Sequence, residues 1–332
     1  MRRPPALWLV ALAVGVGACG SPRPLGLEER PADRVRVPVS SVHYRDYGSA
    51  DALALALRWT AEAPVWVSAH RGAPPPGLPE NSLEAFEYAL NHAPALIETD
   101  VRRTADGVLV LMHDETLDRT TTGAGRVDQT TLAQLRALRL TAEPLAPGGA
   151  RVVTSFRAPT LAEALAWADG RGVLLLDVKR DVPYPELVAA VRQAGAADRV
   201  AVITYSLADH QRLAALAPEL AVSVTVETMA DLDALVAAGV DVDRTIAWTG
   251  IGPPDAALVR RLHGLGVRVQ AGAYGEVDGA ARAAASPLPY AALLATGADV
   301  LSSDEVALAA LAARAANQRN GTPTRAGARG GR

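Results

Sequence analysis

The chain has 332 residues, of which 49% are apolar, and its 33 basic and 36 acidic side chains give a net charge of −3. A chain of this length and composition can bury a full hydrophobic core, and α/β barrels of this size form one domain. The predicted folded part contains no Lys/Arg-rich block, and aromatic residues make up only 4% of the chain, so a nucleic-acid partner is excluded.

The first 18 residues have the features of an export signal. Arg2 and Arg3 precede an apolar run over residues 6–16, which is too short to span a bilayer comfortably. The run ends in Val16-Gly17-Ala18-Cys19, which resembles the lipobox of bacterial lipoproteins, and Cys19 is the only cysteine. The resemblance implies that Cys19 is acylated and becomes the mature N-terminus. The alternative is an ordinary secreted protein with a chance cysteine.

An acylated Cys19 predicts a lipid-anchored, extracytoplasmic protein of the bacterial cell envelope. Several acyl chains anchor a protein firmly, because each buried CH₂ contributes about 0.8 kcal/mol. Gly20 rather than Asp follows the cysteine, which favours the periplasmic face of the outer membrane. We expect residues 19–60 to hold the lipidated cysteine, a linker with several prolines and charges, and a helix over 49–59 that covers the bottom of the core.

From Val65 onward, short Val/Ile/Leu runs alternate with longer Ala/Leu-rich helical stretches, which is typical of β/α units. Strands are predicted over 65–68, 95–97, 108–112, 173–176, 200–203, 221–224, 245–248 and 267–270, and a ninth run over 299–301 would close against the first. Helices are expected over 82–92, 160–170, 185–194, 207–216, 230–238 and 254–264. We predict a (β/α)8 TIM barrel over 61–315, in preference to a doubly wound sheet, and a disordered tail over 316–332.

The link between the second and third predicted strands departs from the β/α pattern. Residues 102–107 are too few for a crossover helix. Asp106-Gly107 indicates a turn instead, and the helical segment is expected later, over 131–136.

Polar side chains stand where the first three predicted strands end. His70 and Arg71 follow the first strand, Glu98 and Asp100 end the second, and His113 follows the third. Polar groups at the carboxyl ends of barrel strands form the active site in such folds. We therefore expect these side chains to converge on one site.

These residue types suit the cleavage of a phosphodiester, which needs a base, an acid and positive charge on the phosphoryl oxygens. His70 and His113 can serve as acid and base because imidazole titrates near neutrality, and which of them is the base stays open. Arg71 can bind two phosphate oxygens at once. Glu98 and Asp100 stand at i and i+2 of a strand, so both point to one face and can hold a hard cation.

The ordered motifs resemble those of the glycerophosphodiester phosphodiesterase family. They are His70-Arg71-Gly72, Pro79-Glu80-Asn81-Ser82-Leu83-Glu84-Ala85-Phe86, Glu98-Thr99-Asp100-Val101, Asp106-Gly107-Val108-Leu109-Val110, the segment from His113 to Thr121, and Pro159-Thr160-Leu161. The resemblance implies a TIM barrel of the phospholipase C-like phosphodiesterase type. It also implies metal-dependent hydrolysis of glycerophosphodiesters to sn-glycerol 3-phosphate and an alcohol, through attack by the glycerol 2-hydroxyl and a cyclic phosphate. Direct attack by a metal-bound hydroxide is the alternative.

Further site residues follow from the same resemblance. The family has Glu-x-Lys at the next strand, and this chain has Asp177-Val178-Lys179, so Asp177 is expected to complete the metal site and Lys179 to bind phosphate with Arg71. Either Mg²⁺ or Ca²⁺ suits such a site. Glu80 is a further candidate for the site, and Tyr274 for the wall beside the alcohol group.

Other side chains near these motifs have simpler predicted roles. Asn81 fits a helix N-cap with Glu84 as its capping-box partner, and Arg119 is expected to pair with Asp118 within its loop. The remaining histidines are expected at the surface: His43, His92, His210 and His263.

Two other functions compete with glycerophosphodiester hydrolysis. Membrane tethering could present the barrel to intact lipids, as in a phospholipase D or a lysophospholipase D. A non-catalytic lipoprotein that binds phosphodiesters is the third hypothesis, but binding alone needs no acid–base pair. The sequence does not indicate the head group or the oligomeric state.

Overall fold

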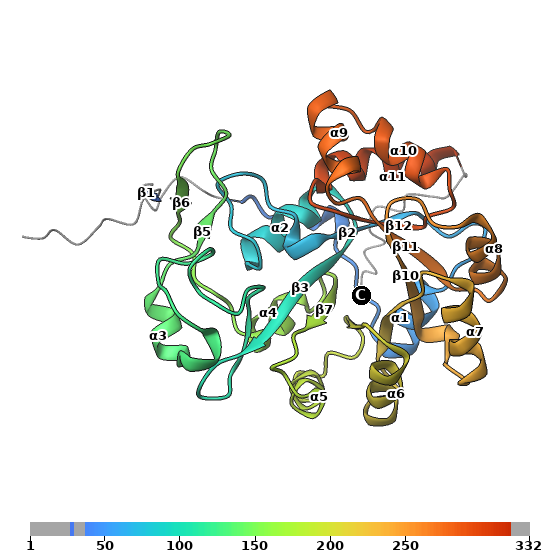
Figure 1. Cartoon of the computed structure of the whole chain (residues 1–332), viewed down its shortest axis with the longest axis horizontal. Coiled ribbons are helices and arrows are strands. Elements are labelled where there is room, and N and C mark those ends of the chain that lie inside the picture. Colours follow the sequence, from blue (N-terminus) through green and yellow to red (C-terminus); the bar gives the residue numbers. More distant parts are fainter. Residues whose placement is uncertain (1–26, 30–36, 320–332) are drawn as a thin grey trace, which may run out of the picture.

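Eight parallel strands of the described residues close into a barrel with helices around it, as predicted (Figure 1). In the computed structural model, residues 27–29 and 37–319 are described, so the predicted signal peptide and Cys19 lie outside the described residues. Strands β2 and β3 pair in parallel and complete the closure. The barrel strands are β2 (Trp66–Ala69), β3 (Ala95–Arg103), β7 (Val173–Val178), β8 (Val200–Thr204), β9 (Ala221–Thr225), β10 (Thr245–Ile251), β11 (Arg268–Gly272) and β12 (Val300–Ser303).

The predicted third strand is not a barrel strand. Strand β4 (Leu109–Leu111) pairs antiparallel with the end of β3, and Val101 lies opposite Leu111. The short link over 102–107 therefore makes a hairpin, because it has no room for a helix that would bring the chain back in parallel. The run predicted as a ninth strand supplies the eighth barrel strand, β12, which pairs with β2.

Each predicted helix is present, with its ends within two residues of the expected positions. These helices are α1 (Ala50–Leu57), α2 (Leu83–His92), α3 (Leu132–Ala137), α4 (Leu161–Ala168), α5 (Tyr184–Gln193), α6 (Leu207–Leu216), α7 (Met229–Ala237) and α8 (Ala256–Gly264). Three further helices, which the sequence pattern did not reveal, are α9 (Glu276–Ala284), α10 (Leu288–Leu294) and α11 (Val306–Arg319). Of the described helices, none combines the length and apolar composition needed to cross a membrane.

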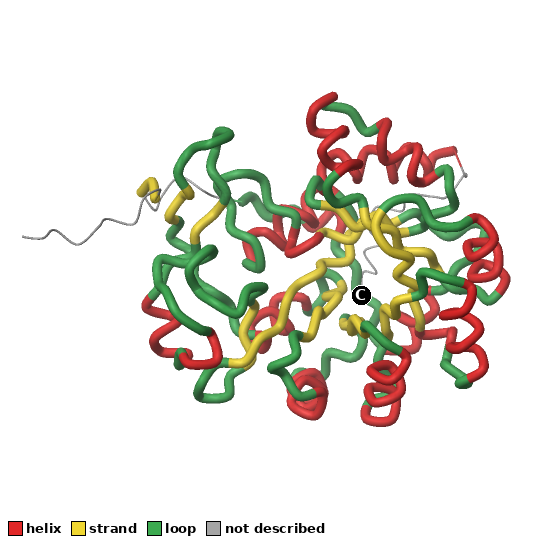
Figure 2. The backbone as a smooth tube through the Cα atoms, in the orientation of Figure 1, coloured by secondary structure: helices red, strands yellow, loops and turns green. Residues whose placement is uncertain are grey.

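The segment between β4 and α4 lies beside the barrel and is mostly loop (Figure 2). It contains β5 (Thr141–Ala142) and β6 (Arg151–Val153), and β6 also pairs with β1 (Leu27–Glu29). Residues 27–29 belong to the predicted linker, so part of that linker is a strand.

Helix α1 closes the bottom of the barrel, as expected. Its Leu53 and Leu57 are at most 1% exposed and pack with Leu96, Leu175 and Ile246 from the barrel strands. Burying a leucine or isoleucine side chain contributes roughly 1.5–3 kcal/mol, so this plug is a substantial part of the core.

Helix α11 continues past the predicted start of the tail at residue 316. Asn317, which is 9% exposed, joins this helix to the chain just before β2. Its Oδ1 accepts from the backbone N–H of Val65 at 2.7 Å, and its Nδ2 donates to the carbonyl of the same residue at 3.1 Å. Residues 316–319 are therefore helical, and the rest of the predicted tail lies outside the described residues.

We expect Asn317→Ala to lower the free energy of unfolding by about 1–3 kcal/mol, because it leaves the peptide groups of Val65 without partners. Urea denaturation measures this change. The neighbouring Gln318→Ala is the control: Gln318 is exposed, so its effect should stay within about 0.5 kcal/mol. Equal stability of the two variants would refute the structural role of Asn317.

Candidate active site

The turn after β2 brings the first site residues to the carboxyl end of the barrel. Residues His70–Gly72 form one turn of 3-10 helix, in which Arg71 has a φ of 52°. This backbone conformation is uncommon for a residue with a side chain. The Arg71 N–H donates to Glu98 Oε2 at 2.7 Å, so the turn is held against β3. Gly72 has a φ of +83°, and a Cβ there would lie 2.8 Å from the Cβ of Ala85, so α2 packs on this turn only because residue 72 is glycine.

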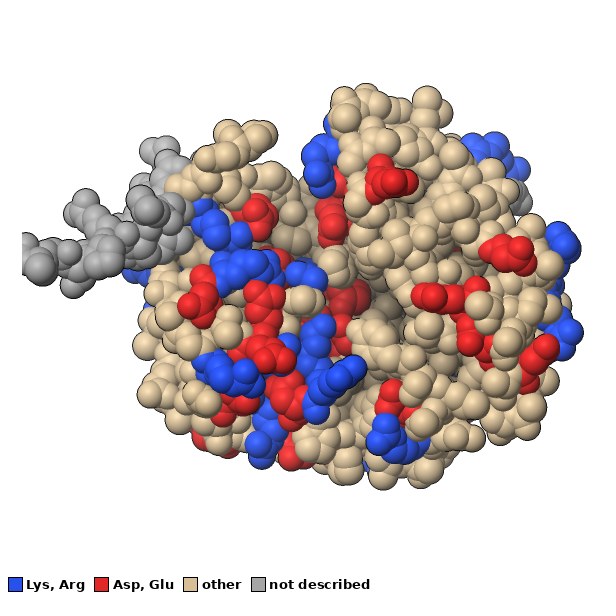
Figure 3. All heavy atoms as spheres, in the orientation of Figure 1, with Lys and Arg blue, Asp and Glu red and all other residues tan. Residues whose placement is uncertain are grey.

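Three carboxylates gather on neighbouring strands beneath this turn, as the sequence predicted. Glu98 and Asp100 lie on β3, and Asp177 lies opposite Asp100 on β7. One oxygen from each lies within 4.8 Å of the others, and the three residues are 5%, 1% and 6% exposed, respectively. Figure 3 shows acidic atoms in the hollow at the centre of this face of the molecule.

This cluster fits a divalent cation. Asp177 Oδ1 is buried without a hydrogen-bond partner among the described residues, which is costly for a carboxylate oxygen. Burial and the charge of Asp100 raise the pKa of the Glu98 carboxyl, because three buried negative charges repel one another. Hard cations such as Mg²⁺ and Ca²⁺ take oxygen ligands of this kind.

Lys179 lies on the same cluster. Its Nζ is 2.7 Å from Asp100 Oδ1 and 2.6 Å from Asp177 Oδ2. Burial alone would raise the pKa of Asp100, but the charges of Lys179 and Arg71 outweigh it and hold that pKa below its usual value. The predicted phosphate-binding lysine is thus in contact with two of the predicted metal ligands.

Asn81 orients one of these carboxylates and does not cap α2. Ser82 is the N-cap, and its hydroxyl accepts from the N–H of Ala85. Asn81 is 3% exposed, and its Nδ2 donates to Asp100 Oδ2 at 2.7 Å, while its Oδ1 accepts from Thr99 Oγ1 at 2.6 Å. The predicted capping role was therefore wrong, because the chain begins its helix one residue later.

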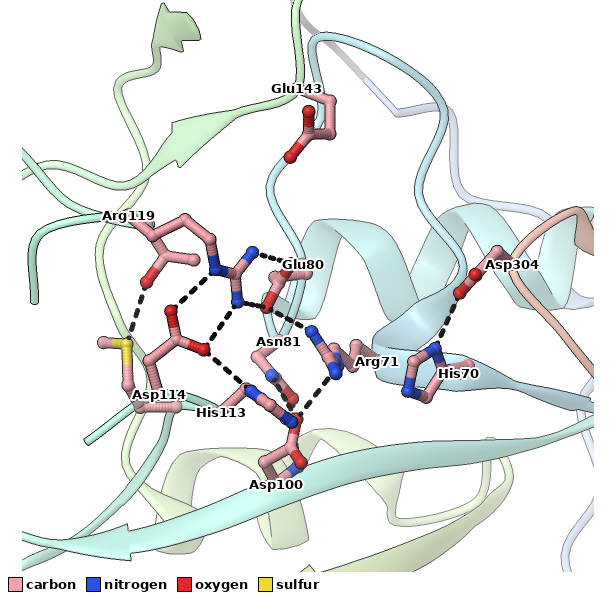
Figure 4. A network of polar contacts seen from close by, with 12 residues as sticks. His70, Arg71, Glu80, Asn81, Asp100, His113, Asp114, Arg119, Glu143 and Asp304 are labelled. Carbon is pink, nitrogen blue, oxygen red and sulfur yellow. Dashed lines mark hydrogen bonds and ion pairs between the residues drawn. The ribbon is translucent and has the colours of Figure 1, made fainter. Parts of the chain in front are cut away.

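A network of ion pairs holds His113 and Arg71 (Figure 4). The Nδ1 of His113 lies 2.7 Å from Asp114 Oδ1, and Arg119 Nε donates to Asp114 Oδ2 at 2.6 Å. Arg119 also donates to both oxygens of Glu80, at 2.8 and 2.7 Å, and Glu80 accepts from Arg71 at 3.1 Å. Glu80 therefore belongs to the site, because it holds the Arg71 guanidinium in place.

The expected pair of Arg119 with Asp118 is absent from the described ion pairs. Asp118 accepts instead from the backbone N–H of Gly125 at 3.2 Å. Arg119 turns toward Asp114 and Glu80, where two carboxylates surround one guanidinium. Arg119 therefore pairs with Asp114 and Glu80, and not with Asp118 as the sequence suggested.

His70 is held from the opposite side of the barrel mouth. Its Nδ1 lies 2.6 Å from Asp304 Oδ1, and its ring is 4.5 Å from that of Tyr274, measured between centroids. Burial lowers the pKa of His70, but the hydrogen bond with Asp304 and the charge of Glu98 outweigh it, and the pKa lies above its ordinary value. Asp304, which the sequence analysis missed, gives His70 the same kind of partner that Asp114 gives His113.

A buried aspartate behind Asp304 fixes its position. Asp278, which is 2% exposed, accepts hydrogen bonds from Tyr290 Oη at 2.6 Å and from Ser303 Oγ at 2.7 Å. Its other oxygen accepts from the backbone N–H of Asp304 at 2.8 Å. Asp278 and Tyr290 come from α9 and α10, the helices that the sequence pattern did not reveal.

Together these contacts place two imidazoles on either side of the Arg71 guanidinium, above Asp100 on β3 (Figure 4). Each imidazole has its Nδ1 engaged by an aspartate, which leaves Nε2 as the nitrogen that can exchange a proton. The arrangement combines two acid–base groups, a guanidinium and a cation-binding cluster. It can therefore bind a phosphodiester and transfer protons on both sides of the phosphorus.

The four remaining histidines are less exposed than predicted. His43, His92 and His263 are half-buried, and His210 is only 4% exposed. The ring of His263 stacks on Trp59, with 4.1 Å between ring centroids, and that of His92 lies 4.4 Å from the ring of Tyr88.

Comparison with known proteins supports the same chemistry. The model of the glycerophosphoryl diester phosphodiesterase family matches residues 70–271, more than half of the chain. The Mycobacterium tuberculosis protein named "Probable glycerophosphodiester phosphodiesterase 1" is 35% identical over 208 residues, which are 58% of this chain and 73% of that protein.

Solved structures share the fold. A glycerophosphoryl diester phosphodiesterase from Parabacteroides distasonis has a TM-score of 0.74 at 28% identity, over 82% of this chain and 94% of that one. An Oleispira antarctica phosphodiesterase, solved with its product sn-glycerol-3-phosphate, has a TM-score of 0.56 at 22% identity, over 75% of this chain and 96% of that one. The chain belongs to the glycerophosphoryl diester phosphodiesterase family and is an enzyme of glycerophosphodiester hydrolysis.

Proposed function

We propose that the protein hydrolyses glycerophosphodiesters to sn-glycerol 3-phosphate and an alcohol by acid–base catalysis with His70 and His113. The observation that carries this proposal is the pair of aspartate-bound imidazoles that flank Arg71 above the carboxylate cluster. The product bound to the Oleispira antarctica neighbour is the product expected here.

The reaction divides into two proton transfers. One imidazole takes the proton of the glycerol 2-hydroxyl as its oxygen bonds to phosphorus, and the other gives a proton to the alcohol oxygen as its bond to phosphorus breaks. Water then opens the cyclic phosphate, and the two imidazoles exchange roles. Arg71 binds two phosphoryl oxygens in this scheme, because its guanidinium is held in place by Glu80.

The carboxylate cluster completes the proposed site. Glu98, Asp100 and Asp177 would hold Mg²⁺ or Ca²⁺, which would neutralise the negative charge on the phosphoryl oxygens. Lys179 adds a second positive charge beside Asp100 and Asp177. Tyr274 lies against His70 and forms the wall on which the alcohol group would rest.

The first test is release of sn-glycerol 3-phosphate from glycerophosphocholine and glycerophosphoethanolamine, with Mg²⁺, Ca²⁺ or a chelator. We expect release that needs one of the two metals, and a loss of about 10²–10⁴-fold in kcat for His70→Ala and for His113→Ala. Both variants should keep the circular dichroism spectrum and melting temperature of the parent protein. Neither side chain fills the barrel core.

Three results would contradict the proposal. Near-parental rates in either histidine variant would remove that histidine from the mechanism, and full activity in chelator would remove the metal. Release of a head group from lysophospholipids, without activity on glycerophosphocholine, would favour the lysophospholipase D alternative.

Asp304 is a positioning residue in this scheme. We expect Asp304→Asn to lower kcat/KM by up to about 10⁴-fold, but by less than His70→Ala, because the imidazole stays but loses the carboxylate that orients it. The pKa of His70 should fall, since the hydrogen bond and charge of Asp304 both raise it. NMR titration of the imidazole measures this fall without reference to turnover.

The matched control is Glu305→Gln, which changes the next carboxylate along the chain. Glu305 forms a surface ion pair with Arg282 and has no described contact with His70. This control should keep both the rate and the His70 pKa. An unchanged His70 pKa in Asp304→Asn would overturn the positioning role.

We also propose that a lipid on Cys19 anchors the enzyme at the periplasmic face of the bacterial outer membrane. The apolar run over 6–16, the lipobox-like residues before Cys19 and the Gly20 that follows support this localisation. In a bacterial host that processes lipoproteins, the parent chain should sediment with outer-membrane vesicles, and Cys19→Ser should appear in the soluble periplasmic fraction. The same distribution for both proteins would exclude the lipid anchor.

A further inference from the structure

A cavity of about 700 Å³ lies at the opposite end of the barrel from the candidate active site. It opens where β2, β3 and β7 begin, between the segment over 42–47 and helix α11. Its wall includes the apolar side chains of Trp66, Leu96, Val173 and Ala313. Its volume is within the range of about 300–1,000 Å³ that is typical of small-molecule sites.

The side chains of this lining that can carry a charge near neutral pH are all basic. They are His43, Arg45, His92, Arg171 and Arg314, and no aspartate or glutamate is among the described residues that line it. Burial lowers the pKa of His43, and the charges of Arg314, Arg45 and His92 lower it further. The cavity therefore has a positive potential that its own walls do not neutralise.

The three arginines have backbone carbonyls and aromatic rings as partners. Arg45 donates to the carbonyl of Tyr44 at 2.7 Å, and Arg314 donates to that of His92 at 3.4 Å. Arg171 donates to the carbonyl of Trp167, and its guanidinium lies 5.8 Å from the ring centroids of Tyr44 and Trp167.

Arg45, Arg171 and Arg314 form no ion pair with a residue that the structure describes, although most other described arginines do. Each guanidinium has five N–H donors, so donors remain for a ligand. The rings and carbonyls hold the arginines in place without cancelling their charge.

We propose that this cavity binds a single-chain anionic amphiphile, with its carboxylate or phosphate head at Arg45, Arg171 and Arg314 and its acyl chain against the apolar wall. A neutral apolar ligand would leave the positive charges without a counter-charge, and a small inorganic anion would leave the apolar wall uncovered. The inference does not depend on the proposed function.

The test uses the whole chain and a dodecanoate that carries a photoactivatable diazirine on its acyl chain. After illumination, mass spectrometry of the digested protein should place the label on peptides that contain residues 42–47, 64–67, 92–96, 171–173 or 310–318. Unlabelled dodecanoate and dodecyl phosphate should compete for this labelling. Dodecanol and glycerol 3-phosphate, each of which has only one part of the proposed ligand, should not compete.

The variant with both Arg45→Gln and Arg314→Gln should reduce this labelling about tenfold or more, because charge-assisted hydrogen bonds to the head group are lost. Arg260→Gln, which removes an exposed arginine of α8 that has no described ion pair, should leave labelling unchanged. Thermal melting confirms that both variants are folded.

Four outcomes would overturn the proposal. Competition by dodecanol equal to that by dodecanoate would mean that the charges contribute nothing. Effective competition by glycerol 3-phosphate would mean that the site takes a free phosphate group and no acyl chain. Unchanged labelling in the Arg45→Gln, Arg314→Gln variant, or a label outside the named peptides, would exclude this cavity as the binding site.

Discussion

The burial of three carboxylates at the mouth of the barrel is the constraint on which the rest of the site depends. Removing charged groups from water costs several kcal/mol per ion unless opposite charges and hydrogen bonds compensate. The surrounding chain supplies that compensation: Lys179 contacts two of the carboxylates, the backbone of Arg71 binds Glu98, and Asn81 binds Asp100. Arg71 and Asn81 both have a left-handed backbone conformation. This conformation directs the N–H of Arg71 and the side-chain amide of Asn81 toward the carboxylates.

The two imidazoles are fixed by separate parts of the fold. On one side, Asp114, Arg119 and Glu80 form a continuous chain of ion pairs from His113 to Arg71, within the segment around α2 and β4. On the other side, His70 depends on Asp304, which is placed by Asp278 from α9. Closure of the barrel between β12 and β2 brings these two parts together. The acid–base pair is thus a product of the completed barrel, and neither half of the chain holds both imidazoles in place alone.

The parts of the site that could be predicted from the sequence depend on local rules. His70, Glu98 and Asp100 follow or end barrel strands, and barrel topology brings such ends together. His113 reaches the site by another route, because β4 runs antiparallel along β3 and brings the chain back to Asp100. Asp177 was expected from the family resemblance. The partners of these residues were missed because they depend on packing between distant segments. Asp278 lies on α9, which contains Gly279, and Tyr290 lies on α10, which begins directly after Pro287 and has Pro289 in its first turn. Glycine and proline so close together are typical of loops, which hid these helices. Arg119 has an acidic neighbour in sequence, Asp118, but the tertiary structure offers it two stronger partners.

The carboxylate cluster at one end of the barrel and the cavity lining at the other have opposite charge, which the net charge of −3 conceals. At the carboxyl end, carboxylates outnumber the cations in contact with them, and Asp177 Oδ1 has no hydrogen-bond partner in the part of the chain that the structure describes. At the amino end, three arginines face a cavity whose described lining has no carboxylate. A folded protein tolerates unpaired charge in a partly buried site only where something else compensates it. The same reasoning that assigns a cation to the acidic end therefore assigns an anion to the basic end, and the apolar wall there indicates that the anion carries a hydrocarbon chain.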